Sequence, residues 1–128
     1  MKHSLLLLII SLVFASCMSS VDTSTNLQPE TFKSRIEGNA VQLVDVRTPK
    51  EFNSGHIKNA ININYLSKHF KDSIRLLQTK IPTYIYCRSG KRSSKSMSKF
   101  KTAGFDSIYQ LKGGFLAWKS LGFTIGKE

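Results

Sequence analysis

From about residue 28 onward, the apolar residues alternate between a helical spacing and short strand-like runs. Phe32 and Ile36 lie four residues apart, as do Phe70 and Ile74, and this spacing places each pair on one face of a helix. The run 41–46 is mostly apolar, which is typical of a strand buried on both faces. The complete pattern predicts helices over residues 29–36, 48–55, 67–78, 93–102 and 115–120, and strands over residues 41–46, 60–63, 83–86 and 107–111.

Strands that are separated by helices predict an α/β domain with a mainly parallel central sheet flanked by helices. In such sheets, ligands bind beyond the carboxyl ends of the strands. Cys87 follows the strand 83–86, and Asp45 and Arg47 lie at the end of the strand 41–46. The expected topology therefore brings these three residues towards one site.

Local signals explain several polar and aromatic residues without a role in chemistry. Thr48, Pro49 and Glu51 match a helix N-terminus, with Thr48 as the N-cap and Glu51 completing a capping box. Phe115 and Trp118 are most simply core residues of the last helix. We therefore expect structural roles for all five residues.

The length and charge of the chain limit what it can bind. Its 128 residues are enough for one domain with one core. The formal net charge of +11 can attract nucleic acid, anionic lipid or small anionic substrates. No Arg- or Lys-rich run is interleaved with aromatic residues, so we expect no nucleic-acid partner. A small anion is favoured because the strongest basic cluster begins beside Cys87 and comprises Arg88, Lys91, Arg92, Lys95, Lys99 and Lys101.

The first residues have the order of an export signal. A short basic start precedes an apolar core over residues 4–15, which is shorter than a membrane span. Cys17 follows two small residues, as in a bacterial lipoprotein signal, whose cysteine becomes the lipidated N-terminus. We expect a signal peptide over residues 1–16, a lipidated N-terminus and flexible tether over residues 17–27, and the folded domain over residues 28–128.

Two interpretations of Cys17 are open. Either it carries lipid, or an ordinary secretory signal is cleaved between Ala15 and Ser20 and Cys17 is incidental. Both place the domain outside the cytoplasm, and the first predicts a periplasmic, membrane-anchored bacterial lipoprotein. A lipidated Cys17 would also leave Cys87 without a disulfide partner in the chain, which favours a reactive role for Cys87.

Cys87 lies in a short loop between the strand 83–86 and the helix 93–102. The free N–H groups and the dipole at a helix N-terminus stabilise an anion. They also lower the pKa of a thiol, and the thiolate is the reactive form. Nearby basic side chains act in the same direction. The loop therefore has the pattern of a nucleophile in an anion-binding site.

Together these segments resemble a single-domain rhodanese, a sulfurtransferase. The resemblance rests on four motifs in the family's order, which cover most of the expected domain. They are LVDVR at residues 43–47, EFNSGHIKNAIN at residues 51–62, YCRSGKRS at residues 86–93 and LKGGFLAW at residues 111–118.

The resemblance implies a rhodanese fold and a two-step transfer of sulfane sulfur. Cys87 would take sulfur from thiosulfate or a similar donor as a persulfide and pass it to cyanide or a thiol. Backbone N–H groups of the loop would surround the sulfur, and Arg92 would brace the loop or meet the sulfonate of the donor. The loop residues implied in substrate binding are Arg88, Ser89, Gly90, Lys91, Arg92 and Ser93.

Asp45, Arg47 and His56 match family positions that support the site. For Asp45 and Arg47 we expect an ion pair or hydrogen bonds that hold the loops, because a thiolate nucleophile needs no general base. For His56 we expect a hydrogen-bonded support of its loop rather than acid–base chemistry.

Three other functions use the same fold. Dual-specificity phosphatases of this fold have one residue more between cysteine and arginine than the four of this loop, Arg88 to Lys91. A shorter ring fits a sulfur atom better than a phosphate, and the same comparison weakens arsenate reduction. A non-enzymatic binding module is the third alternative, and retention of Cys87 argues against it.

We expect no metal site and no cofactor, because the histidines are scattered and no nucleotide-binding glycine motif is present. The expected partners are a small anionic sulfur donor, a thiol or cyanide acceptor, and a membrane through lipid on Cys17. The protein is expected to be a monomer.

Overall fold

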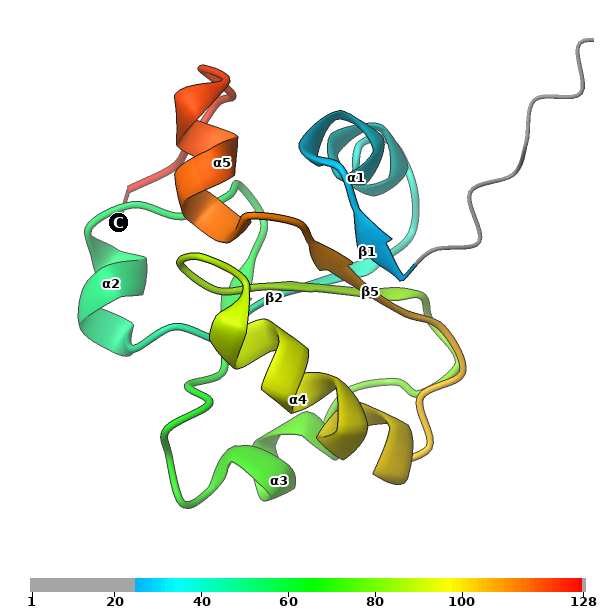
Figure 1. Cartoon of the computed structure of the whole chain (residues 1–128). Helices are drawn as coiled ribbons and strands as arrows, with labels where there is room; N and C mark the ends of the chain where they lie inside the picture. Colours follow the sequence, from blue (N-terminus) through cyan, green and yellow to red (C-terminus); the bar gives the residue numbers. More distant parts are fainter. Residues whose placement is uncertain (1–24, 128) are drawn as a thin grey trace, which may run out of the picture.

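The computed structural model describes residues 25–127, which form a five-stranded sheet with helices on both faces (Figure 1). Every strand pairing in this sheet is parallel, so the expected α/β class is confirmed. The strands lie in the order β1-β5-β4-β2-β3. Their bounds are β1 Asn26–Leu27, β2 Gln42–Asp45, β3 Ile61–Asn62, β4 Thr83–Tyr86 and β5 Ile108–Leu111.

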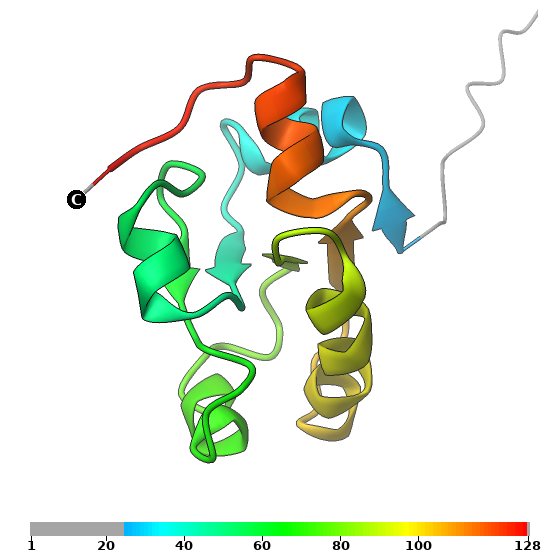
Figure 2. The ribbon, with the colours of Figure 1, turned by 60° about the vertical axis from the view of Figure 1, so that its left-hand side comes forward.

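The described residues include five helices, and four of them cover the faces of the sheet. Helices α1 and α5 lie over one face, and α3 and α4 lie over the other, as two views of the ribbon show (Figures 1 and 2). The bounds of the helices are α1 Pro29–Ile36, α2 Pro49–Asn53, α3 Phe70–Ile74, α4 Lys91–Thr102 and α5 Gly114–Ser120.

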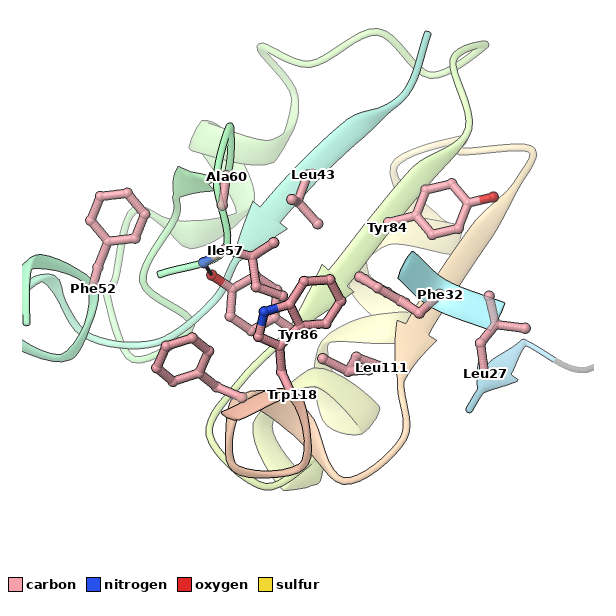
Figure 3. Close-up of a cluster of buried hydrophobic side chains, with 11 residues drawn as sticks. Leu27, Phe32, Leu43, Phe52, Ile57, Ala60, Tyr84, Tyr86, Leu111 and Trp118 are labelled. Atoms are coloured by element: carbon pink, nitrogen blue, oxygen red, sulfur yellow. Dashed lines mark hydrogen bonds between the residues drawn. The ribbon is translucent and has the colours of Figure 1, made fainter. Parts of the chain in front are cut away.

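The alternation of side chains along the central strands builds a core on each face of the sheet. On the face of α1 and α5, Tyr84 and Tyr86 of β4 pack with Phe32 and Trp118 (Figure 3). Ile85, the residue between the two tyrosines, points to the other face. There it belongs to the cluster that includes Phe70, Ile74, Met97 and Phe100 of α3 and α4. Both faces of β4 are therefore buried, as expected for a central parallel strand.

The predicted helix start at Thr48 is confirmed. The Thr48 hydroxyl accepts a hydrogen bond from the Glu51 N–H, and the Glu51 carboxylate accepts one from the Thr48 N–H. Pro49 occupies the first turn of α2, where its missing N–H costs no helical hydrogen bond.

The predicted helix over residues 67–78 is much shorter in the structure, because side chains replace its hydrogen bonds at both ends. The Ser67 hydroxyl accepts a bond from the His69 N–H, which competes with helical pairing. At the other end, the backbone of Gln78 bonds in both directions with the side-chain amide of Gln42 on β2. Only Phe70–Ile74 is helical, and Phe70 and Ile74 are buried as expected.

Strand β1 lies within the segment expected to be a flexible tether. Leu27 is fully buried, and its carbonyl accepts a bond from the Lys112 N–H, which ties the strand to the end of β5. Two residues are too few to show periodicity, so their strand pairing has no sequence signal. The fold therefore begins before residue 28.

The expected signal peptide, Cys17 and most of the tether lie outside the described residues. Within residues 25–127, none of the helices has the length and apolar character that crossing a membrane requires.

Candidate active site

The register of the sheet brings two predicted motifs together at its carboxyl edge. Asp45 of β2 is paired with Tyr86 of β4, and the Val46 N–H donates to the Tyr86 carbonyl at 2.9 Å. Arg47 and Cys87 therefore leave neighbouring strands at the same edge of the sheet, within one residue of each other in register. This is where ligands bind in parallel sheets.

The Cys87 sulfur lies inside the loop that joins β4 to α4. The Gly90 N–H donates to the sulfur at 3.1 Å, and the Ser93 hydroxyl lies 3.5 Å from it. Gly90 adopts a φ of 103°, a conformation that side chains disfavour, and it turns the chain into the first residue of α4. The loop thus closes around the sulfur at a helix N-terminus, as the sequence predicts.

This environment favours the thiolate of Cys87. Burial raises the pKa of the Cys87 thiol, but hydrogen bonds from the Ser93 hydroxyl and from the N–H groups of Ser93, Gly90 and Ser89 outweigh it. The resulting pKa lies below the ordinary value of a cysteine. The residue is 1% exposed, so the thiolate is held by protein dipoles rather than by bulk water.

Ser93 is itself positioned by a residue that the sequence does not single out. The Ser93 hydroxyl donates to the Gln110 side-chain oxygen at 2.9 Å. Gln110 lies on β5 and also accepts from the Ser94 hydroxyl at 3.1 Å. No motif marks Gln110, because its contact with Ser93 depends on the pairing of β4 and β5.

Arg92 braces the loop through Glu51. Its guanidinium donates to the two carboxylate oxygens of Glu51 at 2.7 and 2.8 Å. The hydrogen bonds from Arg92 lower the pKa of Glu51 to about 2. The sequence explains Glu51 as a capping residue, and the structure adds that it joins α2 to the Cys87 loop. The only sequence signal for this second contact is the pair of opposite charges in two separate motifs.

Asp45 and Arg47 form a buried ion pair at the carboxyl edge of the sheet. Arg47 donates to the Asp45 carboxylate at 2.6 to 3.0 Å and to the Gly55 carbonyl at 2.7 Å. Burial lowers the pKa of Arg47, but the bonds with Asp45 outweigh it, and the pKa is raised. The guanidinium also lies 4.1 Å from the centre of the Phe115 ring. The pair therefore links the end of β2 to the turn after α2 and to α5.

His56 supports the turn that follows α2. Its Nδ1 lies 3.1 Å from the Phe52 carbonyl, and its ring stacks on the Phe52 ring at 3.9 Å. Its backbone exchanges two hydrogen bonds with Gly126, at 2.9 and 2.8 Å. His56 thereby fixes the C-terminal segment next to the α2 turn.

The remaining loop residues form the outer edge of the site. Arg88, Ser89 and Lys91 are exposed. Within residues 25–127, no side-chain nitrogen of Arg88, Lys91 or Arg92 is hydrogen-bonded to the Cys87 sulfur. Arg88 and Lys91 are therefore exposed beside the sulfur-binding loop, and the N–H groups of the loop backbone face the sulfur.

Helix α5 is bonded directly to the Cys87 loop. The Phe115 N–H donates to the Cys87 carbonyl at 2.8 Å, and the Leu116 N–H donates to the Arg88 carbonyl at 3.0 Å. A Cβ on Gly114 would lie 2.6 Å from the Cys87 and Arg88 carbonyl oxygens, so only glycine permits this approach. Gly114, the first residue of α5, therefore has a packing role against the Cys87 loop.

The arrangement supplies a buried thiolate, an oriented set of N–H donors and external positive charge. It suits covalent transfer of a small group from an anionic donor. No cluster of histidine, cysteine, aspartate or glutamate that could hold a metal ion occurs among residues 25–127.

Comparison with protein families gives a match over most of the chain. A model described as the rhodanese-like domain matches residues 28–121. The chain is 32% identical over 100 residues to thiosulfate sulfurtransferase GlpE of Pseudomonas aeruginosa, which covers 78% of this chain and 88% of GlpE. It is similar in structure to the rhodanese-like domain of Alr3790 from Anabaena sp., with a TM-score of 0.74, 27% identity, and 82% and 80% of the two chains covered.

Two further relatives are longer than the matching region. An uncharacterised protein of Synechocystis sp. is 36% identical over 109 residues, 85% of this chain and 60% of that protein. A tRNA uridine(34) hydroxylase of Onion yellows phytoplasma is 32% identical over 104 residues, 76% of this chain and 33% of the hydroxylase. The chain thus spans about a third to three fifths of the length of these two relatives.

Proposed function

This chain belongs to the rhodanese-like domain family, and we propose that it is a sulfurtransferase that carries sulfur on Cys87. The observation that carries the proposal is the Cys87 sulfur, buried in a closed loop and facing the N–H groups of Ser89, Gly90 and Ser93. The similarity to thiosulfate sulfurtransferase GlpE supports it.

In the first step, the Cys87 thiolate attacks the outer sulfur of thiosulfate or a related donor. A bond forms between the two sulfurs, the sulfur–sulfur bond of the donor breaks, and its electron pair leaves with sulfite. The product is an anionic persulfide on Cys87. The same N–H groups then stabilise its charge, which costs no reorganisation because α4 already fixes the loop.

In the second step, a thiol or cyanide takes the outer sulfur and releases the Cys87 thiolate. The exposed cations Arg88 and Lys91 attract the anionic donor, and Arg92 with Glu51 holds the loop closed. Asp45, Arg47 and His56 act as structural supports. Cys87 is already a thiolate, so the reaction needs no general base to deprotonate it.

Mass spectrometry of the protein after exposure to thiosulfate tests the proposal. We expect a gain of one sulfur atom on Cys87 and none in Cys87→Ser. Parallel incubation with p-nitrophenyl phosphate and with arsenate tests the phosphatase and reductase alternatives. Turnover of either compound without sulfur loading by any of several donors would overturn the assignment, and no chemistry at all would indicate a binding module.

We also propose that the protein acts outside the cytoplasm, anchored by lipid on Cys17. The support is the order of basic, apolar and small residues before Cys17. Labelling of the full chain with a fatty-acid analogue in a bacterial host, with Cys17→Ser as the control, tests this. Equal labelling of both proteins, or recovery of the wild type only from the cytoplasm, would contradict it.

A further inference from the structure

A pocket of about 350 Å³ lies next to the Cys87 loop, and we call it the rim pocket. It extends from the loop over the first turns of α5 to the C-terminal segment, and α2 forms part of its wall. The residues that matter for its chemistry are Arg88, Phe115, Leu116, Lys119, Ile125 and Lys127.

Backbone hydrogen bonds fix the rim pocket relative to the Cys87 sulfur. On one side, the N–H groups of Phe115 and Leu116 bond to the carbonyls of Cys87 and Arg88. On the other side, the β-bridge between His56 and Gly126 holds the C-terminal segment that forms part of the pocket wall. A molecule in the rim pocket therefore has a defined position relative to the loop.

The rim pocket carries an excess of positive charge. The acidic residue in its wall, Glu51, is already paired with Arg92. Arg88, Lys119 and Lys127 are exposed, and none of them forms an ion pair within residues 25–127. Such unpaired cations attract a ligand with negative groups.

The rim pocket also has an apolar side. Leu116 and Ile125, which both line it, are 39% and 36% exposed. Pockets for organic ligands begin at about 300 Å³ and combine apolar walls with a few polar groups. The rim pocket has this size and composition, whereas the Cys87 sulfur is almost completely buried inside its loop.

We propose that the rim pocket binds the sulfur acceptor, and that this acceptor is a small organic thiol with carboxylate groups. The inference rests on the proposed sulfurtransferase function and specifies its second substrate. Lys119 and Lys127 bind the carboxylates, and Leu116 and Ile125 contact the carbon chain. The thiol then points across Arg88 towards the persulfide.

The acceptor reaction is balanced without an added oxidant or reductant. The acceptor sulfur bonds to the outer sulfur of the Cys87 persulfide, and the sulfur–sulfur bond to Cys87 breaks. The electron pair of that bond returns to Cys87 as the thiolate. The thiol proton of the acceptor leaves with the new organic persulfide.

The test measures discharge of the persulfide in single-turnover experiments on the full chain. Cys87 is first loaded with thiosulfate, and the loaded fraction is measured by mass spectrometry. Loaded protein is then mixed with mercaptosuccinate, which carries two carboxylates, or with thioglycerol, which is neutral. Rates are compared at equal thiolate concentration. We expect mercaptosuccinate to react about tenfold faster in the wild type, since about 1.4 kcal/mol of charge attraction gives that ratio.

The variant Lys119→Gln/Lys127→Gln should bring this ratio close to one. The matched control is Lys58→Gln/Lys101→Gln, which removes two exposed lysines away from the rim pocket and should keep the ratio. A wild-type ratio near one, an unchanged ratio in the Lys119/Lys127 variant, or an equal loss in the control would overturn the inference. Failure of the loading step itself would instead refute the proposed function, so the two failures are distinguishable.

Discussion

The ion pair between Glu51 and Arg92 should hold the end of the Cys87 loop, where it enters α4, against α2. The change that tests it is Glu51→Gln, which keeps the size of the side chain but removes its charge and one acceptor oxygen. In the structure, both oxygens are used by Arg92, and one of them also accepts from the Thr48 N–H at 3.0 Å. Glutamine cannot reproduce the bidentate pair.

The pKa of Glu51 gives the size of the expected effect. It falls from an ordinary 4.5 to about 2 in the folded chain, chiefly through Arg92. That difference of about 2.5 corresponds to about 3 kcal/mol at about 1.36 kcal/mol per pKa unit. The side chains of Arg92 and Glu51 are 22% and 28% exposed, so solvent screening reduces our expectation to about 1–2 kcal/mol.

The contribution of Glu51 to the free energy of unfolding depends on pH in one direction. Because the folded pKa of Glu51 lies below the unfolded value, the stabilisation is complete at pH values above the unfolded pKa. It is lost as the pH falls from 4.5 towards 2. Wild type and Glu51→Gln should therefore differ in stability at pH 7 and converge in acid.

Urea unfolding of wild type, Glu51→Gln, Arg92→Gln and the double variant at pH 7 measures the coupling between the two residues. We expect about 1–2 kcal/mol, and a smaller difference between wild type and Glu51→Gln at pH 3. The exposed pair of Lys33 and Glu37 provides the matched control, with an expected coupling below about 0.5 kcal/mol. Equal couplings for the two pairs, or a pH-independent difference, would refute the reasoning.

Three further predictions concern the loop and the edge of the sheet. Ser93→Ala removes the hydroxyl bond to the sulfur and should raise the pKa of Cys87, which the pH profile of iodoacetamide alkylation measures; an unchanged profile would contradict this. Gly114→Ala should destabilise the fold by more than about 2 kcal/mol, since its Cβ would meet backbone atoms at 2.6 Å and its φ is +62°; Gly104→Ala, which meets no neighbouring atom, is the comparison in urea unfolding. Leu27→Ala should cost about 2–4 kcal/mol in the same assay if β1 is part of the fold, and a cost near zero would return these residues to the tether.

Most of the fold can be predicted from the sequence because its signals are local. The apolar spacing of Phe32 with Ile36, and the capping box of Thr48 and Glu51, need only a few neighbouring residues. The order of strand, cysteine loop and helix around Cys87 is local in the same sense, and it already indicates a stabilised thiolate. The predicted length of the helix over residues 67–78 is wrong because Gln42, a residue far away in the chain, forms hydrogen bonds with the backbone of Gln78.

Contacts between distant segments have no such signal. Arg92 and Glu51 are 41 residues apart, and Ser93 and Gln110 are 17 apart. Each residue has a sufficient local explanation, as a cap, a loop residue or a strand residue. Their contacts with each other follow only from the pairing of the strands and from the position of α2 beside the Cys87 loop.

The sequence by itself determined the α/β class, most of its elements and the position of Cys87 before a helix N-terminus, because periodicity, capping and this loop order act over a few residues. The tertiary structure decided what surrounds that thiol. Parallel pairing brings the carboxyl ends of β2, β4 and β5 to one edge of the sheet. The absence of a side chain on Gly114 lets the backbone of α5 form hydrogen bonds with the Cys87 loop. Only this convergence produces the ion pair of Glu51 and Arg92 and, beside it, a pocket lined by the exposed side chains of Lys119 and Lys127.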